Sequence, residues 1–314
     1  MGEMFLESCV SILILMCLAL PGYILVKAKI LSKEHIQPLV TVLLYVCQPF
    51  IMVKSFLTKQ YDTELLANMG IVFLVAAVTQ LAAFGIARLI FSYDDDKARR
   101  GVHIFSTAVG NVGFIGIPIC QIFIQDPMQY TEAVLYISVY LVAFNLISWT
   151  LGAYMVTGDK KYISIKKALI NPPMLALVVA LPLFFAGVIL PSDHIGTRCI
   201  GYIADMNTPL AMIVLGMRFA LVKFTDVFKG WSTYLVTFLK LIATPLLVYA
   251  CLFALNLSPV LLKTIIIVSA MPTANMVLMM AEKFGGDTEA SVRCIMNTTI
   301  FTIATLPLIM LLPM

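Results

Sequence analysis

Long apolar runs alternate with short polar interruptions along nearly the whole chain. A helix needs about 20 apolar residues to cross the hydrocarbon core of a bilayer. The longest charged interruption, Ser92 to Arg100, has the length of a loop. The pattern predicts an all-α integral membrane protein without a water-soluble domain, with ten transmembrane helices over residues 5–27, 36–57, 66–91, 101–125, 131–157, 168–190, 196–222, 231–256, 260–283 and 289–313.

Composition supports a lipid environment. Of the 314 residues, 61% are hydrophobic and 12% are charged, whereas about a quarter of the residues in soluble domains are charged. The seven cysteines show no CxxC spacing and no neighbouring histidine. We interpret them as small buried hydrophobic residues and expect neither disulfides nor a metal site.

The distribution of basic residues predicts the orientation. With the N-terminus outside, sixteen Lys and Arg residues fall in inner loops and four in outer loops. Cytoplasmic loops carry the excess of positive charge, so both termini are predicted to lie outside a plasma (cytoplasmic) membrane. The net charge of +4 reflects this bias and not a nucleic-acid partner. The N-terminal segment has Glu3 and Glu7 but no basic residue, so we expect its apolar run to remain as a span.

Prolines recur in matching spans of the two halves. They pair as Pro21 with Pro182, Pro49 with Pro209, and Pro118 with Pro272. We therefore predict a five-helix repeat over residues 1–157 and a second over residues 158–314. Because five is odd, the second repeat is inverted in the membrane. Inverted repeats with interrupted helices in matching positions are typical of secondary transporters.

Spans 4 and 9 carry the clearest interruptions. Gly110, Gly113 and Gly116 share one face of span 4, which lets another backbone approach closely. Pro118 removes a helix hydrogen bond and crowds a carbonyl, and span 9 repeats the device at Pro272. Backbone groups freed in this way are tolerated where they are buried in protein or line a wet cavity.

Two broken helices that cross near the midplane would point positive half-helix ends at one place, which suits a carboxylate. The candidate polar contacts are Asn111, Gln121 and Asn275. The alternative for these amides is interhelical hydrogen bonding without a ligand. Gln48 and Thr208 each precede a proline and are expected to line the pathway, although a kinked helix explains both equally well.

Two ionisable residues, Asp205 and Lys240, fall near the centres of spans 7 and 8. A charge at the bilayer centre costs at least about 2.5–3.5 kcal/mol, so it is normally paired or functional. Either the two form a structural ion pair, or one binds substrate or carries a coupling proton. The place of Lys240, which matches Gln80 in the first repeat, favours the functional role for the lysine.

Several motifs resemble those of the auxin efflux carrier family. They are GNVGFIGIPI at 110–119, NPP at 171–173, AMPTANMVLMMAEKFGGDTEAS at 270–291 and TLP at 305–307. The family includes plant auxin exporters and bacterial permeases for malate and malonate, and it is similar in fold to the bile acid sodium symporters. The loop between spans 5 and 6 is only Gly158 to Lys167, whereas plant carriers have a large one. The chain thus resembles the compact bacterial type.

The resemblance implies a scaffold of spans 1, 2, 6 and 7 and a transport domain of spans 3–5 and 8–10. It also implies an elevator-like motion and a homodimer. By position, Asn111 and Pro118 fall on the first crossover and Pro272 on the second. The predicted function is secondary active transport of small organic anions, mono- or dicarboxylates such as malate or malonate.

Two other classes of protein compete with a transporter. An intramembrane protease is disfavoured because the chain lacks HExxH and because Asp205 is the only aspartate deep in a span. A non-transporting sensor with the same fold is the alternative, and net flux would distinguish it. The chain has no phosphate-binding loop of the GxxxxGK(S/T) type, so we expect no cofactor. The energy for transport is then expected to come from coupling to H⁺ or Na⁺ or from a partner protein.

Overall fold

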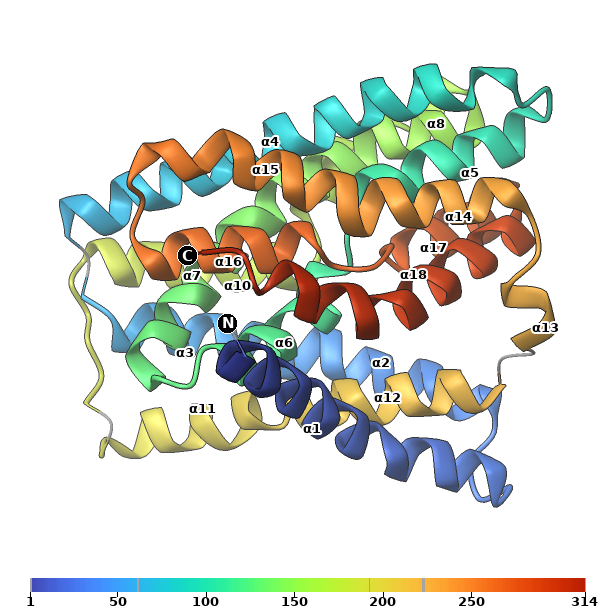
Figure 1. The fold of residues 1–314 in the computed structure, drawn as a ribbon. Coiled ribbons are helices and arrows are strands. Elements are labelled where there is room, and N and C mark those ends of the chain that lie inside the picture. The colour runs from blue at the N-terminus through green and yellow to red at the C-terminus, as the bar shows by residue number, and fades with distance from the viewer. Residues whose placement is uncertain (1, 61, 192, 222–223, 314) are drawn as a thin grey trace.

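The computed structural model describes residues 2–60, 62–191, 193–221 and 224–313 (Figure 1). In these ranges regular structure is helical apart from one isolated β-bridge, which confirms the all-α prediction. With η marking 3₁₀ and π turns, the elements are α1 (Gly2–Lys27), η1 (Lys33–His35), α2 (Ile36–Val42), η2 (Leu43–Cys47), α3 (Gln48–Thr58), α4 (Thr63–Ile90), η3 (Phe91–Tyr93), α5 (Lys97–Ala108), η4 (Val112–Gly116), α6 (Ile117–Phe123), α7 (Pro127–Ile147), η5 (Ser148–Gly152), α8 (Ala153–Thr157), η6 (Lys160–Tyr162), α9 (Ile165–Leu169), α10 (Pro172–Phe185), α11 (Ile195–Asp205), α12 (Asn207–Leu221), α13 (Phe224–Val227), α14 (Trp231–Phe238), η7 (Leu239–Ala243), α15 (Thr244–Leu252), η8 (Phe253–Leu255), α16 (Pro259–Ser269), α17 (Met276–Phe284) and α18 (Thr288–Ile309).

Within the described residues, six continuous stretches are long and apolar enough to cross a membrane, and a bent pair at Lys160–Leu169 and Pro172–Phe185 would make a seventh. Val112–Phe123 and Pro259–Ser269 are shorter because each belongs to an interrupted helix. The count of ten spans and the inverted repeat stay predictions. The six stretches are Lys33–Thr58, Thr63–Tyr93, Pro127–Thr157, Ile195–Leu221, Trp231–Leu255 and Thr288–Ile309.

Polar residues between the apolar runs start the next helices. Asp62 accepts a hydrogen bond from the Leu65 N–H, and Asp126 accepts one from the Gln129 N–H. Asn171 does the same for α10, with Pro172 following in the first turn. The first N–H groups of a helix have no partner within it, so these side chains satisfy them. The interruptions thus determine where each helix begins.

The helices pack side by side in a bundle (Figure 1). α1 packs along α12 at the lower edge, and α4 packs on α5 and α7 at the upper edge. At the α1–α12 contact a Cβ added to Gly216 would overlap the carbonyl oxygen of Ala19. Glycine therefore permits direct backbone contact between these two helices. The division into a scaffold and a transport domain stays a prediction.

The described cysteines are free thiols, three buried and three exposed. The expectation of buried cysteines is therefore right for Cys47, Cys120 and Cys294 and wrong for Cys17, Cys199 and Cys251. Apolar residues on an outward helix face are normal where the solvent is lipid, so an apolar run does not by itself predict burial. The side chain of Cys9 lies outside the described residues.

Candidate substrate site at the helix crossing

The interruptions of the two broken helices meet in space. Residues 109–111 leave the helix between α5 and η4, and residues 270–275 do so between α16 and α17. The Asn111 N–H donates to the Pro272 carbonyl at 2.7 Å, and the Ala274 N–H donates to the Val109 carbonyl at 3.2 Å. Gly110 and Thr273 form the centre of this antiparallel bridge. Each break therefore supplies hydrogen-bond partners that the other lost, which makes non-helical backbone tolerable inside a membrane protein.

Hydrogen bonds to α18 and α5 hold the second break. The Thr273 N–H donates to Thr298 Oγ1 of α18 at 3.0 Å, and Thr273 Oγ1 donates to the Ser106 carbonyl of α5 at 3.0 Å. All three residues are buried. These two hydrogen bonds hold the second break against α18 and α5.

The two prolines differ in their positions relative to the breaks. The first break lies at 109–111, upstream of Pro118, and Pro118 sits in the first turn of α6 after the π turn η4. Pro49 and Pro245 follow the π turns η2 and η7 in the same way. A proline ring clashes with the carbonyl four residues earlier, and a wider turn relieves that clash. The wider turn before Pro118 agrees with the predicted crowding of a carbonyl, but the break lies upstream of this proline, whereas Pro272 lies within its break.

Positive helix ends converge on the crossing. Asn111 precedes η4 and Asn275 precedes α17, so both half-helices start there. Asn111 is buried, and its side-chain amide makes no hydrogen bond within the described part of the chain. The partial positive charge at the start of a helix favours an anion at such a place.

Arg218 of α12 reaches both broken helices. Its Nη1 donates to Asn275 Oδ1, and its guanidinium carbon lies 5.7 Å from the centre of the Phe114 ring. Its Nε is buried without a hydrogen-bond partner among the described residues. Arg218 falls near the end of a predicted span and is one of the sixteen basic residues assigned to inner loops from the sequence. The sequence feature that could have indicated a role in the site is that Arg218 is a single arginine inside the apolar run of α12.

Lys240 is the second cation at the crossing. It is 1% exposed, and its Nζ lies 3.2 Å from where a Cβ on Gly110 would stand. The described residues give its ammonium no ion pair or hydrogen bond. Asp205 pairs with Lys54 at 2.9 Å instead and is 67% exposed, so the alternative of an Asp205–Lys240 pair is not found.

Three buried amide and hydroxyl side chains lie on α3 and α12. Gln48 Nε2 lies 2.6 Å from where a Cβ on Gly113 would stand, and it is buried without a partner. Thr208 Oγ1 and both polar side-chain atoms of Asn207 are also buried without partners in the described structure. Asn207 was not among the candidate site residues predicted from the sequence, although it directly precedes Thr208 and Pro209. Gln121 lies on the exposed face of α6 and is not brought to the crossing.

The family model described as membrane transport protein matches residues 7–310. The chain belongs to this family. The match confirms the resemblance drawn from the motifs. An uncharacterized transporter of Methanocaldococcus jannaschii is 24% identical over 306 residues, covering 95% of this chain and 96% of that protein. An uncharacterized transporter of Methanothermobacter thermautotrophicus is 25% identical over 316 residues, covering 97% and 98%. The family and these relatives are transporters, not enzymes.

This membrane transport protein has an apolar cavity beside the crossing. Its volume is about 300 Å³. Pro272 comes from the second break and Ile115 and Ile119 from the first broken helix, while Met212 and Phe219 come from α12. The cavity thus lies where α12 meets both broken helices. It offers space for a hydrophobic group beside the second break.

Proposed function

We propose that the protein is a secondary transporter of small organic anions that bind where the two broken helices cross. The observation that carries this proposal is the pair of cations, Arg218 and Lys240, at the converging half-helix ends without a described carboxylate partner. An uncompensated charge inside a membrane protein is costly, and a bound carboxylate would offset that cost. Asn111, Asn275 and Gln48 would then orient the anion through their amides.

The apolar cavity favours one kind of anion over another. A monocarboxylate with its charge at Arg218 of α12 would place its hydrocarbon part against Ile115 and Met212, which line the cavity. The second carboxylate of malate or malonate would meet an apolar wall, where an unpaired charge is strongly disfavoured. Among mono- and dicarboxylates, we therefore favour monocarboxylates with a small apolar body.

The wider transport cycle follows from the same proposal. The scaffold would comprise spans 1, 2, 6 and 7, and the remaining spans would carry the crossing in an elevator-like motion between the two sides. Both termini would lie outside, and the scaffold would pair two copies into a homodimer. Asp205 is exposed and paired with Lys54, so Lys240 is the better candidate for coupling to protons. The site would thus combine a fixed cation, Arg218, with one that can titrate.

The test is uptake into proteoliposomes of radiolabelled propionate, benzoate, malate and malonate, with pH and sodium gradients imposed separately. We expect gradient-driven uptake of a monocarboxylate by the wild type and its loss in Asn111→Ala and Arg218→Gln. Gln129→Ala is the matched control, because Gln129 lies exposed at the start of α7.

Two other outcomes would each reject part of the proposal. Binding seen as thermal stabilisation, without accumulation under any gradient, would indicate a sensor with a transporter fold. Uptake of malate in preference to propionate or benzoate would refute the monocarboxylate assignment and leave the transporter class intact.

A further inference from the structure

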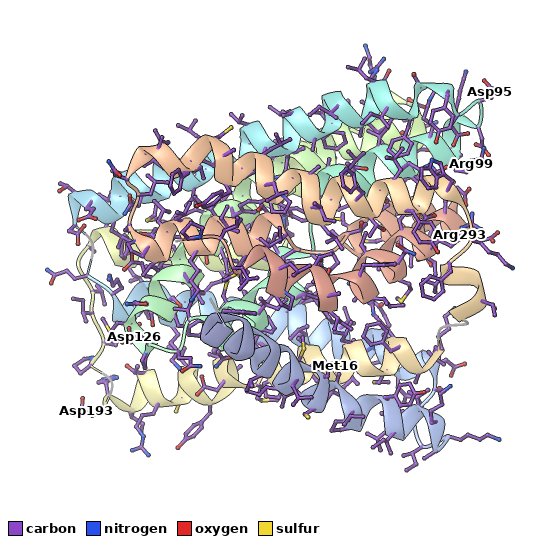
Figure 2. The ribbon with its side chains drawn as sticks, in the orientation of Figure 1. Met16, Asp95, Arg99, Asp126, Asp193 and Arg293 are labelled. Atoms are coloured by element: carbon purple, nitrogen blue, oxygen red, sulfur yellow. The ribbon has the colours of Figure 1, made fainter. Side chains whose placement is uncertain are left out.

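A second cavity lies at the end of the helix bundle that carries Asp95 and Arg99 in Figure 2, far from the end with Asp126 and Asp193. Its volume is about 530 Å³, and α4, α5 and α8 surround it. Its lining includes three cationic side chains and three hydroxyl groups, from Arg88, Lys97, Arg100, Ser92, Tyr154 and Thr157. Aspartate and glutamate are absent from this lining.

Three carboxylates near the cavity are engaged elsewhere. Arg99 binds Asp94 through two nitrogens, at 2.6 and 2.8 Å, and this bond lowers the pKa of the Asp94 carboxyl. Asp96 accepts the N–H groups of the first turn of α5, and Asp159 pairs with Lys161 at 2.8 Å. These three carboxylates therefore do not neutralise the cations of the cavity.

The three cations of the cavity keep their charge available. Arg88 and Lys97 have no ion pair or hydrogen bond with any described residue. Arg100 donates only to the Asp94 carbonyl, at 3.4 Å. Three like charges around one hollow repel each other, and an anion with several oxygens would relieve that repulsion.

A hydrophobic stripe on α4 leads to the cavity. Leu74, Val78, Leu81 and Leu89 are 62, 64, 47 and 76% exposed and recur at helical spacing. They occupy an outward face of a helix that is long and apolar enough to cross a membrane, so this face contacts acyl chains. Arg88 and Ser92 follow the stripe at the end of α4. The headgroup of a lipid lying along the stripe would reach the cavity.

We propose that this cavity binds the phosphate headgroup of an anionic phospholipid, whose acyl chains lie along the stripe on α4. The phosphate oxygens accept hydrogen bonds from Arg88, Lys97 and Arg100, and the hydroxyl group of Tyr154 adds a further donor. Basic pockets between transmembrane helices recognise anionic headgroups through this chemistry. The proposal is independent of the transported substrate, because the cavity lies apart from the helix crossing.

The test uses the full chain in detergent with phosphatidylglycerol or phosphatidylcholine at equal mole fraction. Bound lipid is counted by native mass spectrometry, and thermal unfolding is followed in parallel. The variant Arg88→Gln/Lys97→Gln/Arg100→Gln removes the three cations of the cavity. The matched control, Lys33→Gln/Lys160→Gln/Lys166→Gln, removes three exposed cations outside the lining of the cavity.

We expect wild type and control to retain phosphatidylglycerol in preference to phosphatidylcholine. The cavity variant should lose that preference on the order of a hundredfold in relative affinity. Equal retention of the two lipids by the wild type, or a cavity variant that retains phosphatidylglycerol like the wild type, would overturn the proposal. Stabilisation by inorganic phosphate or glycerol 3-phosphate as strong as that by the lipid would overturn the lipid assignment in favour of a soluble phosphate ester.

A single variant keeps the test decisive if the triple variant does not fold. Arg88 is exposed on α4 and makes no described polar contact, so Arg88→Gln should fold. It is expected to weaken phosphatidylglycerol binding severalfold. Unchanged affinity in this folded variant would count against the site.

Discussion

Gly113→Ala should impair transport at the proposed site while leaving the free energy of unfolding nearly unchanged. A Cβ at this position would lie 2.6 Å from Gln48 Nε2. The amide must therefore retreat by about 0.8 Å to reach ordinary van der Waals contact. Because that amide is the far end of a flexible side chain, it can move without displacing backbone. We expect the free energy of unfolding to change by less than about 1 kcal/mol, since alanine also favours a helix over glycine.

The effect on transport should be larger. A hydrogen bond to a charged group contributes about 1.5–3 kcal/mol, and about 1.4 kcal/mol corresponds to a factor of ten. If Gln48 contacts the anion, displacing its amide should raise the KM for uptake by roughly ten- to a hundredfold. Gly85→Ala is the control for glycine replacement, because a Cβ on Gly85 meets nothing within 4 Å.

A double-mutant cycle identifies the route of the effect. Gln48→Ala alone should raise KM by a similar factor, and adding Gly113→Ala to it should change little, because the two act through one amide. Initial rates of proteoliposome uptake over a range of substrate concentrations give the four KM values. If Gly113→Ala raises KM by the same factor in the Gln48→Ala background, then Gln48 does not mediate the effect and the reasoning is refuted.

Two further substitutions address charge and packing. Lys240→Met should abolish uptake while leaving the unfolding temperature equal to or above that of the wild type, because it removes a buried cation without a described partner; uptake with unchanged pH dependence would argue against a role for Lys240. Gly216→Ala should lower the free energy of unfolding by about 1–3 kcal/mol, because its Cβ overlaps the carbonyl oxygen of Ala19 and forces α1 from α12. Gly70→Ala, where a Cβ meets nothing within 4 Å, should be neutral or stabilising in the same thermal unfolding measurement, and equal losses in both variants would contradict the packing argument.

The sequence by itself determined the helical class, the membrane setting and the family. Long apolar runs admit few structures other than helices in lipid, because every backbone group must be bonded within its own segment. The interruption near Gly110 and Asn111 was visible as glycine and asparagine within an apolar run. Each of these features depends on neighbours in the chain.

Only the tertiary structure decided which polar residues meet. Arg218 with Asn275, Lys240 beside Gly110, and Asp205 with Lys54 each join segments distant in sequence. In a soluble helix the polar face indicates which side is outward. A helix surrounded by lipid and by other apolar helices lacks that signal, so its rotation about its own axis cannot be predicted from its sequence. For this reason Gln121 was expected at the crossing but is exposed, and Arg218 was assigned to a loop but lies between the two broken helices.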